Sequence, residues 1–164
     1  MADRMKLGRI DTSKPVCVGI GWNYLGVSVS KGVSPKQIAI VDYLCLATEP
    51  YLCVNECSSC GARYFDRRNA CANCGLHEFS QVRIANSAIL KAFSIVHNAA
   101  PGIQVPFVSA IVETQDGTSV RANIVDLDDP MKVELGMRLG LTTYVCGIDN
   151  EGTECVAFGY TPVT

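Results

Sequence analysis

The feature that most constrains the fold of this chain is a pair of Cys-x-x-Cys-Gly motifs, CSSCG at 57–61 and CANCG at 71–75, with ten residues between Cys60 and Cys71. In such a motif a tight turn holds two sulfurs close together. The glycine permits a positive φ and lets backbone N–H groups approach the sulfurs. Two such turns predict a tetrahedral four-thiolate site with Cys57, Cys60, Cys71 and Cys74 as ligands. Zinc is the expected metal, because it binds thiolates tightly and has no redox demand.

The predicted metal site is structural rather than catalytic. Four protein ligands leave no open position for water or substrate. The metal would instead order a segment that is too small to build a core of its own. A pair of redox dithiols is the alternative, but two matching motifs in series fit a metal better.

The chain contains nine cysteines, a high and odd number. Disulfides are not expected in a reducing cytosol, where cysteine pairs at fixed spacing indicate metal ligands. The cysteines outside the two motifs stand among apolar neighbours and are expected to be small buried hydrophobes. They are Cys17, Cys45, Cys53, Cys146 and Cys155.

The hydropathy and charge of the sequence limit where the protein is expected to be located and which partners it is expected to bind. The N-terminus, MADRMKLGRIDTSKP, has no uninterrupted apolar region and predicts no signal peptide. The most apolar window, at 15–29, is too short and too polar to span a bilayer, so a cytoplasmic protein without membrane contact is expected. Residues 84–164 carry four Lys or Arg against nine Asp or Glu, which argues against a nucleic-acid partner for this half.

The second half of the chain shows strand periodicity. Apolar residues alternate after position 75, and turn signals separate the runs. Five or six short strands, with one helical turn after the third long strand, predict a five-stranded OB-type barrel, with a β-sandwich as the alternative. Strands are expected at 51–56, 79–84, 88–96, 107–113, 119–125, 138–146 and 155–160, and the helical turn at 129–133.

The residues before the first motif predict a short N-terminal helix. Ser34 can cap it, Pro35 suits its first turn, and apolar residues recur at helical spacing until Pro50 approaches. The helix is expected near 35–47, and 15–30 are expected to form a strand or hairpin. The chain thus divides into an N-terminal extension (1–50), a rubredoxin-like zinc ribbon (51–78) and a barrel (79–164).

No catalytic constellation is recognisable. The sequence has no Ser-His-Asp arrangement, no P-loop and no Gly-x-Gly-x-x-Gly, and its carboxylates form no evident acid/base pair. We therefore expect a chain that is not catalytic alone.

Three segments carry a resemblance to a known family: CSSCGARYFDRRNACANCG, FSIVHNAAPGIQVPFVSAIVETQDGTSVRANIVD and DPMKVELGMRLGL. In this order they resemble the acyl-CoA-associated zinc-ribbon/OB-fold proteins, over roughly 34–162. Such proteins are small subunits or domains beside a thiolase-like enzyme, as in archaeal acetoacetyl-CoA thiolase, steroid side-chain lyases, phloroglucinol acetyltransferase and benzoylsuccinyl-CoA thiolase. There the thiolase subunit carries the nucleophilic cysteine, and the small subunit supports the complex and helps to hold CoA.

The resemblance implies a non-catalytic, acyl-CoA-binding and scaffolding subunit of a hetero-oligomeric thiolase-type acyltransferase. The segment between the motifs offers arginines for phosphates and aromatic rings for a planar group. Equally, its aromatic residues could pack the ribbon on the barrel while its arginines are solvated. The candidate CoA contacts are Arg63, Tyr64, Phe65, Arg67 and Arg68, with His97, Pro106 and Phe107 at the barrel entrance. A rubredoxin-like electron carrier and a ribbon/OB module for single-stranded nucleic acid are the alternatives.

Overall fold

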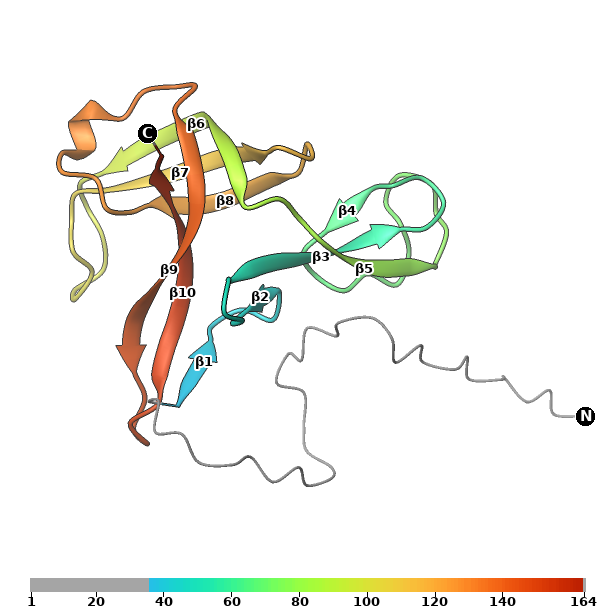
Figure 1. The fold of residues 1–164 in the computed structure, drawn as a ribbon, viewed down its shortest axis with the longest axis horizontal. Coiled ribbons are helices and arrows are strands. Elements are labelled where there is room, and N and C mark those ends of the chain that lie inside the picture. The colour runs from blue at the N-terminus through green and yellow to red at the C-terminus, as the bar shows by residue number, and fades with distance from the viewer. Residues whose placement is uncertain (1–35, 164) are drawn as a thin grey trace, which may run out of the picture.

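The computed structural model describes residues 36–163, and the regular secondary structure of this part of the chain is almost entirely β-strand (Figure 1). No helix among these residues is long and apolar enough to cross a membrane. The strands are β1 (Gln37–Ala39), β2 (Leu44–Cys45), β3 (Tyr51–Cys57), β4 (Arg63–Tyr64), β5 (Phe79–Arg83), β6 (Ser87–Val96), β7 (Phe107–Thr114), β8 (Ser119–Ile124), β9 (Arg138–Ile148) and β10 (Glu154–Pro162). A 3₁₀ turn, η1 (Pro130–Lys132), follows β8.

The last five strands form a closed barrel. Its order is β10-β8-β7-β6-β9, and an antiparallel pairing of β9 with β10 closes the circle. The β8–β10 pair is parallel at Tyr160 and Ile124, whereas the other barrel pairs are antiparallel. This confirms the OB-type barrel and rules out the β-sandwich, because one sheet curls back on itself instead of two sheets packing face to face.

Alternation of apolar residues explains why these segments form barrel strands. Val120, Ala122 and Ile124 of β8 are buried while the residues between them are more exposed. A strand turns successive side chains to opposite faces, so this pattern sends one row into the barrel. Leu139 and Tyr160 are completely buried in the same core.

A second, smaller sheet carries the cysteine motifs. β3 lies at its centre, with β2 at its beginning and both β4 and β5 along its length, and every pairing is antiparallel. We call β3, β4, β5 and the two cysteine turns the ribbon. Buried Leu52, Val54 and Ile84 belong to the same apolar core as the barrel residues, so the root of the ribbon is packed on the barrel rather than tethered to it.

The helix predicted near 35–47 is wrong for the described residues. From residue 36 the chain forms β1, a turn and β2. β1 runs parallel to β10, with Ile38 opposite Cys155. The run Ile38-Ala39-Ile40-Val41 is rich in β-branched residues, which favour a strand once a partner edge is available. The strand or hairpin expected at 15–30 lies outside the described residues.

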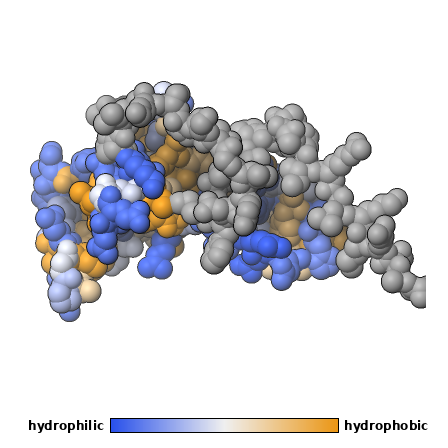
Figure 2. Space-filling model, turned by 90° about the horizontal axis from the view of Figure 1, so that it is seen from below, coloured by the Kyte–Doolittle hydropathy of each residue, from blue (hydrophilic) through white to orange (hydrophobic). Residues whose placement is uncertain are grey.

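Apolar side chains also reach the surface of the described part. Figure 2 shows hydrophobic and hydrophilic residues side by side on one face. The most exposed large hydrophobic residues are Ile148, Met131, Leu135 and Ile103. Cys146 is exposed as well, so the expectation of a buried small hydrophobe is wrong for this cysteine, which lies near the end of β9.

Candidate metal centre and its connection to the barrel

The two cysteine turns have nearly the same backbone geometry. Gly61 has φ +72° and Gly75 has φ +75°, a left-handed conformation that glycine adopts without strain. The N–H of each glycine donates to the carbonyl of the first cysteine of its motif, at 2.9 Å for Cys57 and 2.8 Å for Cys71. Repetition of this turn explains how two short segments present their sulfurs to a common point.

The four sulfurs of the motifs meet in one cluster. The Sγ atoms of Cys57, Cys60, Cys71 and Cys74 all lie within 4.8 Å of one another. The Cys57–Cys74 pair is separated by 3.6 Å and the Cys60–Cys71 pair by 3.5 Å. A tetrahedron with Zn–S bonds of about 2.3 Å has S–S edges of about 3.8 Å. The spacing therefore fits a four-thiolate metal site, and these residues could hold a metal ion such as zinc.

The clustered thiols shift one another's pKa values in opposite directions. A hydrogen bond from the Tyr64 hydroxyl lowers the pKa of Cys71 to about 6. The N–H of Leu76 lowers the pKa of Cys74, but burial and the neighbouring thiols outweigh it and raise that pKa to about 12. Sulfurs this close cannot all be thiolates without a positive charge among them, because like charges disfavour one another's ionisation.

Tyr64 lies directly at the sulfur cluster. Its hydroxyl oxygen is 3.4 Å from Cys71 Sγ and accepts a hydrogen bond of 3.1 Å from the N–H of Ala72. The Arg68 guanidinium lies over its ring, 4.9 Å from the centroid, and Phe79 packs edge-on at 6.0 Å. Tyr64 is thus engaged within the ribbon.

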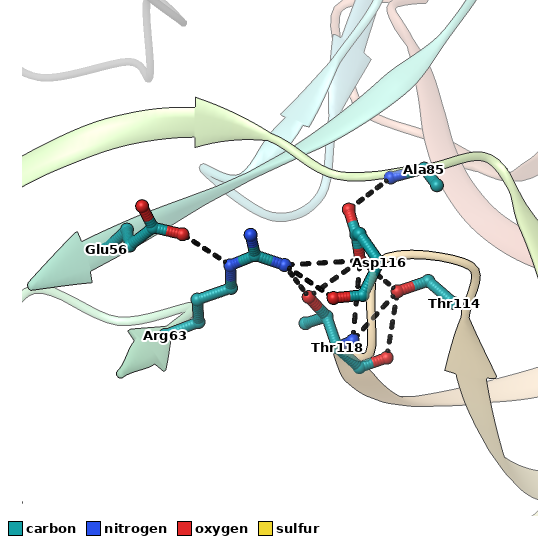
Figure 3. Close-up of polar contacts among 6 residues, drawn as sticks. All are labelled: Glu56, Arg63, Ala85, Thr114, Asp116 and Thr118. Atoms are coloured by element: carbon teal, nitrogen blue, oxygen red, sulfur yellow. Dashed lines mark hydrogen bonds and ion pairs between the residues drawn. The ribbon is translucent and has the colours of Figure 1, made fainter. Parts of the chain in front are cut away.

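Arg63 connects the ribbon to the barrel (Figure 3). Its Nε donates to Glu56 Oε2 at 2.6 Å. Its Nη1 donates at 2.8 Å to the hydroxyl of Thr118 and at 3.1 Å to the carbonyl of Asp116. Both barrel partners belong to the β7–β8 turn, so a single guanidinium bridges two strands of the ribbon and one barrel turn.

Asp116 organises the barrel side of this connection. Its carboxylate accepts the N–H of Ala85 at 2.8 Å and the hydroxyl protons of Thr114 and Thr118 at 2.5 Å and 3.0 Å. Burial acts to raise the pKa of Asp116, but these hydrogen bonds outweigh it and leave the pKa below its usual value. Ala85 follows β5, so Asp116 also fastens the chain where it passes from ribbon to barrel.

Phe65 packs inside the molecule, whereas two arginines remain outside. The Phe65 ring lies 4.7 Å from that of Tyr43, which in turn lies 5.8 Å from Phe158 of β10. Arg67 and Arg68 are exposed on the loop between the cysteine turns. A shallow groove beside this loop is lined by Val54, Gly61, Arg63, Phe65 and residues 116–119.

The structure does not bring the two groups of candidate CoA contacts together. His97 and Pro106 are exposed in the β6–β7 loop, and Phe107 begins β7. Arg63 instead contacts the turn that follows the other end of β7. An eight-residue strand spans about 25 Å, so the ribbon residues and the β6–β7 loop residues lie at opposite ends of the barrel.

Sequence reasoning missed the partners of Arg63. Residues 115–117 were recognisable only as a turn, and Glu56 only as a strand residue. No local pattern marks a contact between residues 53 positions apart, as Arg63 and Asp116 are. The aspartate of the Gln-Asp-Gly turn is the one local sign, because aspartate side chains in turns often accept backbone hydrogen bonds.

Comparisons with known proteins agree with this architecture. Residues 81–143 match the family model of the ChsH2 C-terminal OB-fold domain. The chain is similar to a solved structure described as an Ltp2-ChsH2(DUF35) aldolase, with 25% identity and a TM-score of 0.56, over 70% of this chain and 86% of that one. A DUF35-family protein of unknown function from Sulfolobus solfataricus is similar at 16% identity and a TM-score of 0.40, over 64% of this chain and 73% of that one. No curated protein matches the sequence.

A four-cysteine ribbon packed on an OB-type barrel defines the class of protein. Within that class, the chain is similar to the ChsH2-type OB-fold proteins described as DUF35, from which its barrel model and its solved neighbour come.

Proposed function

We propose that this chain is a non-catalytic, acyl-CoA-binding and scaffolding subunit of a thiolase-type enzyme complex that forms or cleaves a carbon–carbon bond in a CoA thioester. The observation that carries the proposal is the similarity to the Ltp2-ChsH2(DUF35) aldolase, which extends over most of both chains. In this proposal the ribbon, which includes β5 beyond the boundary expected at residue 78, is a zinc-held module, β6 to β10 are the barrel, and the enzyme partner supplies the catalytic groups.

Two features of the described residues support the role of a subunit. Met131 and Leu135, four positions apart in and just after η1, are both more than 60% exposed, and such side chains are available for contact with another protein. Arg63 joins the ribbon to the barrel through hydrogen bonds to Glu56 and to the β7–β8 turn. Both features suit a chain that holds a partner in a defined position.

The proposed metal is zinc with a structural role. The four sulfurs have the number, identity and spacing that a tetrahedral zinc ion requires. When bound, zinc would neutralise the thiolates and hold the two turns together. An electron carrier with iron in the same cage is the competing function, and it is distinguished by colour, because a four-thiolate zinc site is colourless and the corresponding iron site is red.

The proposed CoA contacts begin at the ribbon. Arg67 and Arg68 have exposed guanidinium groups that suit the phosphates of CoA. The groove at Val54 and Phe65 would accept the apolar part of the ligand. Arg63 already donates hydrogen bonds to Glu56 and Asp116, so in this proposal it lines the groove and does not bind a phosphate. His97, Pro106 and Phe107 would form a separate contact at the other end of the barrel.

The proposed function is tested by affinity purification of the tagged chain from its native host, followed by mass spectrometry. We expect a larger thiolase-like or aldolase-like enzyme in a fixed ratio to this chain, and no acyl-CoA activity of this chain alone. Recovery of the chain without an enzyme, under conditions of low salt and chemical cross-linking, would contradict the subunit role.

We expect Arg67→Ala to weaken binding of CoA to the complex about tenfold, because one charge-assisted phosphate contact contributes roughly 1–2 kcal/mol. Isothermal titration calorimetry with CoA measures the change. Arg121→Ala is the matched control, since Arg121 is an exposed arginine of the barrel strand β8. If the Arg67→Ala complex and the unmodified complex bind CoA with equal affinity, Arg67 does not contact CoA.

A further inference from the structure

Tyr64 occupies the one position in β4 that faces the second cysteine turn. It follows the first turn by three residues, and its hydroxyl reaches Cys71, the first ligand of the second turn. Phe79 packs edge-on against the ring, and the Arg68 guanidinium lies over it. The ring therefore has little freedom to move its hydroxyl away from the sulfur.

The hydrogen-bond partners of the hydroxyl establish the direction of its contact with sulfur. The Tyr64 oxygen already accepts the Ala72 N–H at 3.1 Å, which leaves its own proton to be donated. A metal-bound cysteine is a thiolate and has no proton to give. The 3.4 Å contact with Cys71 Sγ is then an O–H···S hydrogen bond from tyrosine to ligand.

Cys71 receives a second donor as well. The N–H of Asn73 points to the same sulfur at 3.4 Å. Two donors on one thiolate withdraw negative charge from it, and four thiolates around a divalent ion leave a net charge of about −2 to be distributed. Cys71 is also buried, unlike Cys60 and Cys74, so its charge depends on protein donors rather than on water.

From this geometry we propose that Tyr64 is a positioning residue of the metal centre, whose hydroxyl holds the Cys71 thiolate in place and stabilises its charge. The inference rests on the proposed metal site. Tyr64 links the two cysteine turns, because it lies next to the first turn and hydrogen-bonds a ligand of the second turn. The arginine over the ring adds to the effect, since a nearby cation makes a phenol a stronger donor.

Tyr64→Phe in the full chain tests the proposal. We expect its zinc affinity, measured by competition with a colorimetric chelator, to fall about 10-fold or more. In the cobalt-substituted protein the thiolate-to-metal charge-transfer band should move to longer wavelength, because the sulfur electrons are held less tightly. Tyr51→Phe is the matched control, since Tyr51 also lies beneath a guanidinium, that of Arg83 at 4.6 Å, but in β3 away from the sulfurs.

The possible outcomes separate this inference from the metal proposal. If the unmodified chain binds zinc, and Tyr64→Phe has the same affinity and cobalt spectrum, the role of Tyr64 is refuted and the metal site stands. If the unmodified chain takes up neither zinc nor cobalt, both proposals fail. Equal losses in Tyr64→Phe and Tyr51→Phe would also overturn the inference, because the effect would then not be specific to the sulfur contact.

Discussion

Cys60→Ser is expected to abolish stable zinc binding and to unfold the ribbon while the barrel keeps its strands. A serine hydroxyl is a poor ligand for zinc compared with a thiolate, and three ligands cannot close a structural site. Cys60 is exposed, so the substitution removes a ligand without creating a cavity in the core. Metal analysis of the purified chain and limited proteolysis at the loop between the cysteine turns measure the two effects.

The control for Cys60→Ser is Cys146→Ser. Cys146 is exposed too, but it lies in β9, where its Sγ donates a hydrogen bond to the carbonyl of Cys155. We expect this variant to retain its metal and its resistance to protease. A fully metallated and protease-resistant Cys60→Ser protein would show that the four-cysteine site is not what holds the ribbon.

Asp116→Ala is expected to loosen the ribbon from the barrel and to lower the free energy of unfolding by about 2–3 kcal/mol, the usual cost of losing hydrogen bonds to a charged group. The substitution removes the acceptor for Ala85, Thr114 and Thr118, and it takes a carboxylate from beside Arg63, at 3.3 Å. Urea unfolding followed by circular dichroism gives the free energy.

Asp149→Ala is the matched control. Asp149 also sits in a hairpin turn and accepts the N–H groups of Glu151 and Thr153, but it joins only β9 to β10. We expect a smaller loss of stability and no change in protease cleavage between ribbon and barrel. Equal effects of the two substitutions would mean that Asp116 acts as a turn residue and not as a connection.

The stabilising effect of the Asp116 carboxylate should also be visible in how the stability of the protein depends on pH. The pKa of Asp116 is lowered in the folded chain, so its contribution is complete above the unfolded value of about 3.9 and is lost as the pH falls toward and below the folded value. The unmodified protein should therefore lose stability below about pH 4 more steeply than Asp116→Asn. Parallel pH profiles would contradict the assignment.

The proposed roles divide the segment between the cysteine motifs into inner and outer residues. Arg63, Tyr64 and Phe65 are used by the barrel contact, the sulfur cluster and the aromatic packing. Arg67 is left with an exposed charge for a ligand or partner, whereas the guanidinium of the exposed Arg68 also stacks on the Tyr64 ring. This division combines the two alternatives that the sequence left open, since the aromatic residues pack while only part of the arginines are solvated.

Local patterns in the sequence were sufficient to predict the barrel and the cluster of four cysteines. The residues of β7 and β8 alternate with a period of two, and the turn between them contains Asp116 and Gly117, so the positions of these barrel strands could be predicted. The four cysteines were identifiable because a metal knuckle is a contiguous motif whose geometry is set by five neighbouring residues.

Only the tertiary structure decided the features that depend on distant partners. Residues 37–39 have a sequence compatible with a helix, but the open edge of β10 makes them a strand, and backbone pairing outweighs the small differences in propensity. The Arg63–Asp116 contact and the direction of the Tyr64 hydroxyl arise in the same way. A charged or polar side chain has several possible partners along the chain, and the packing of ribbon on barrel selects one of them.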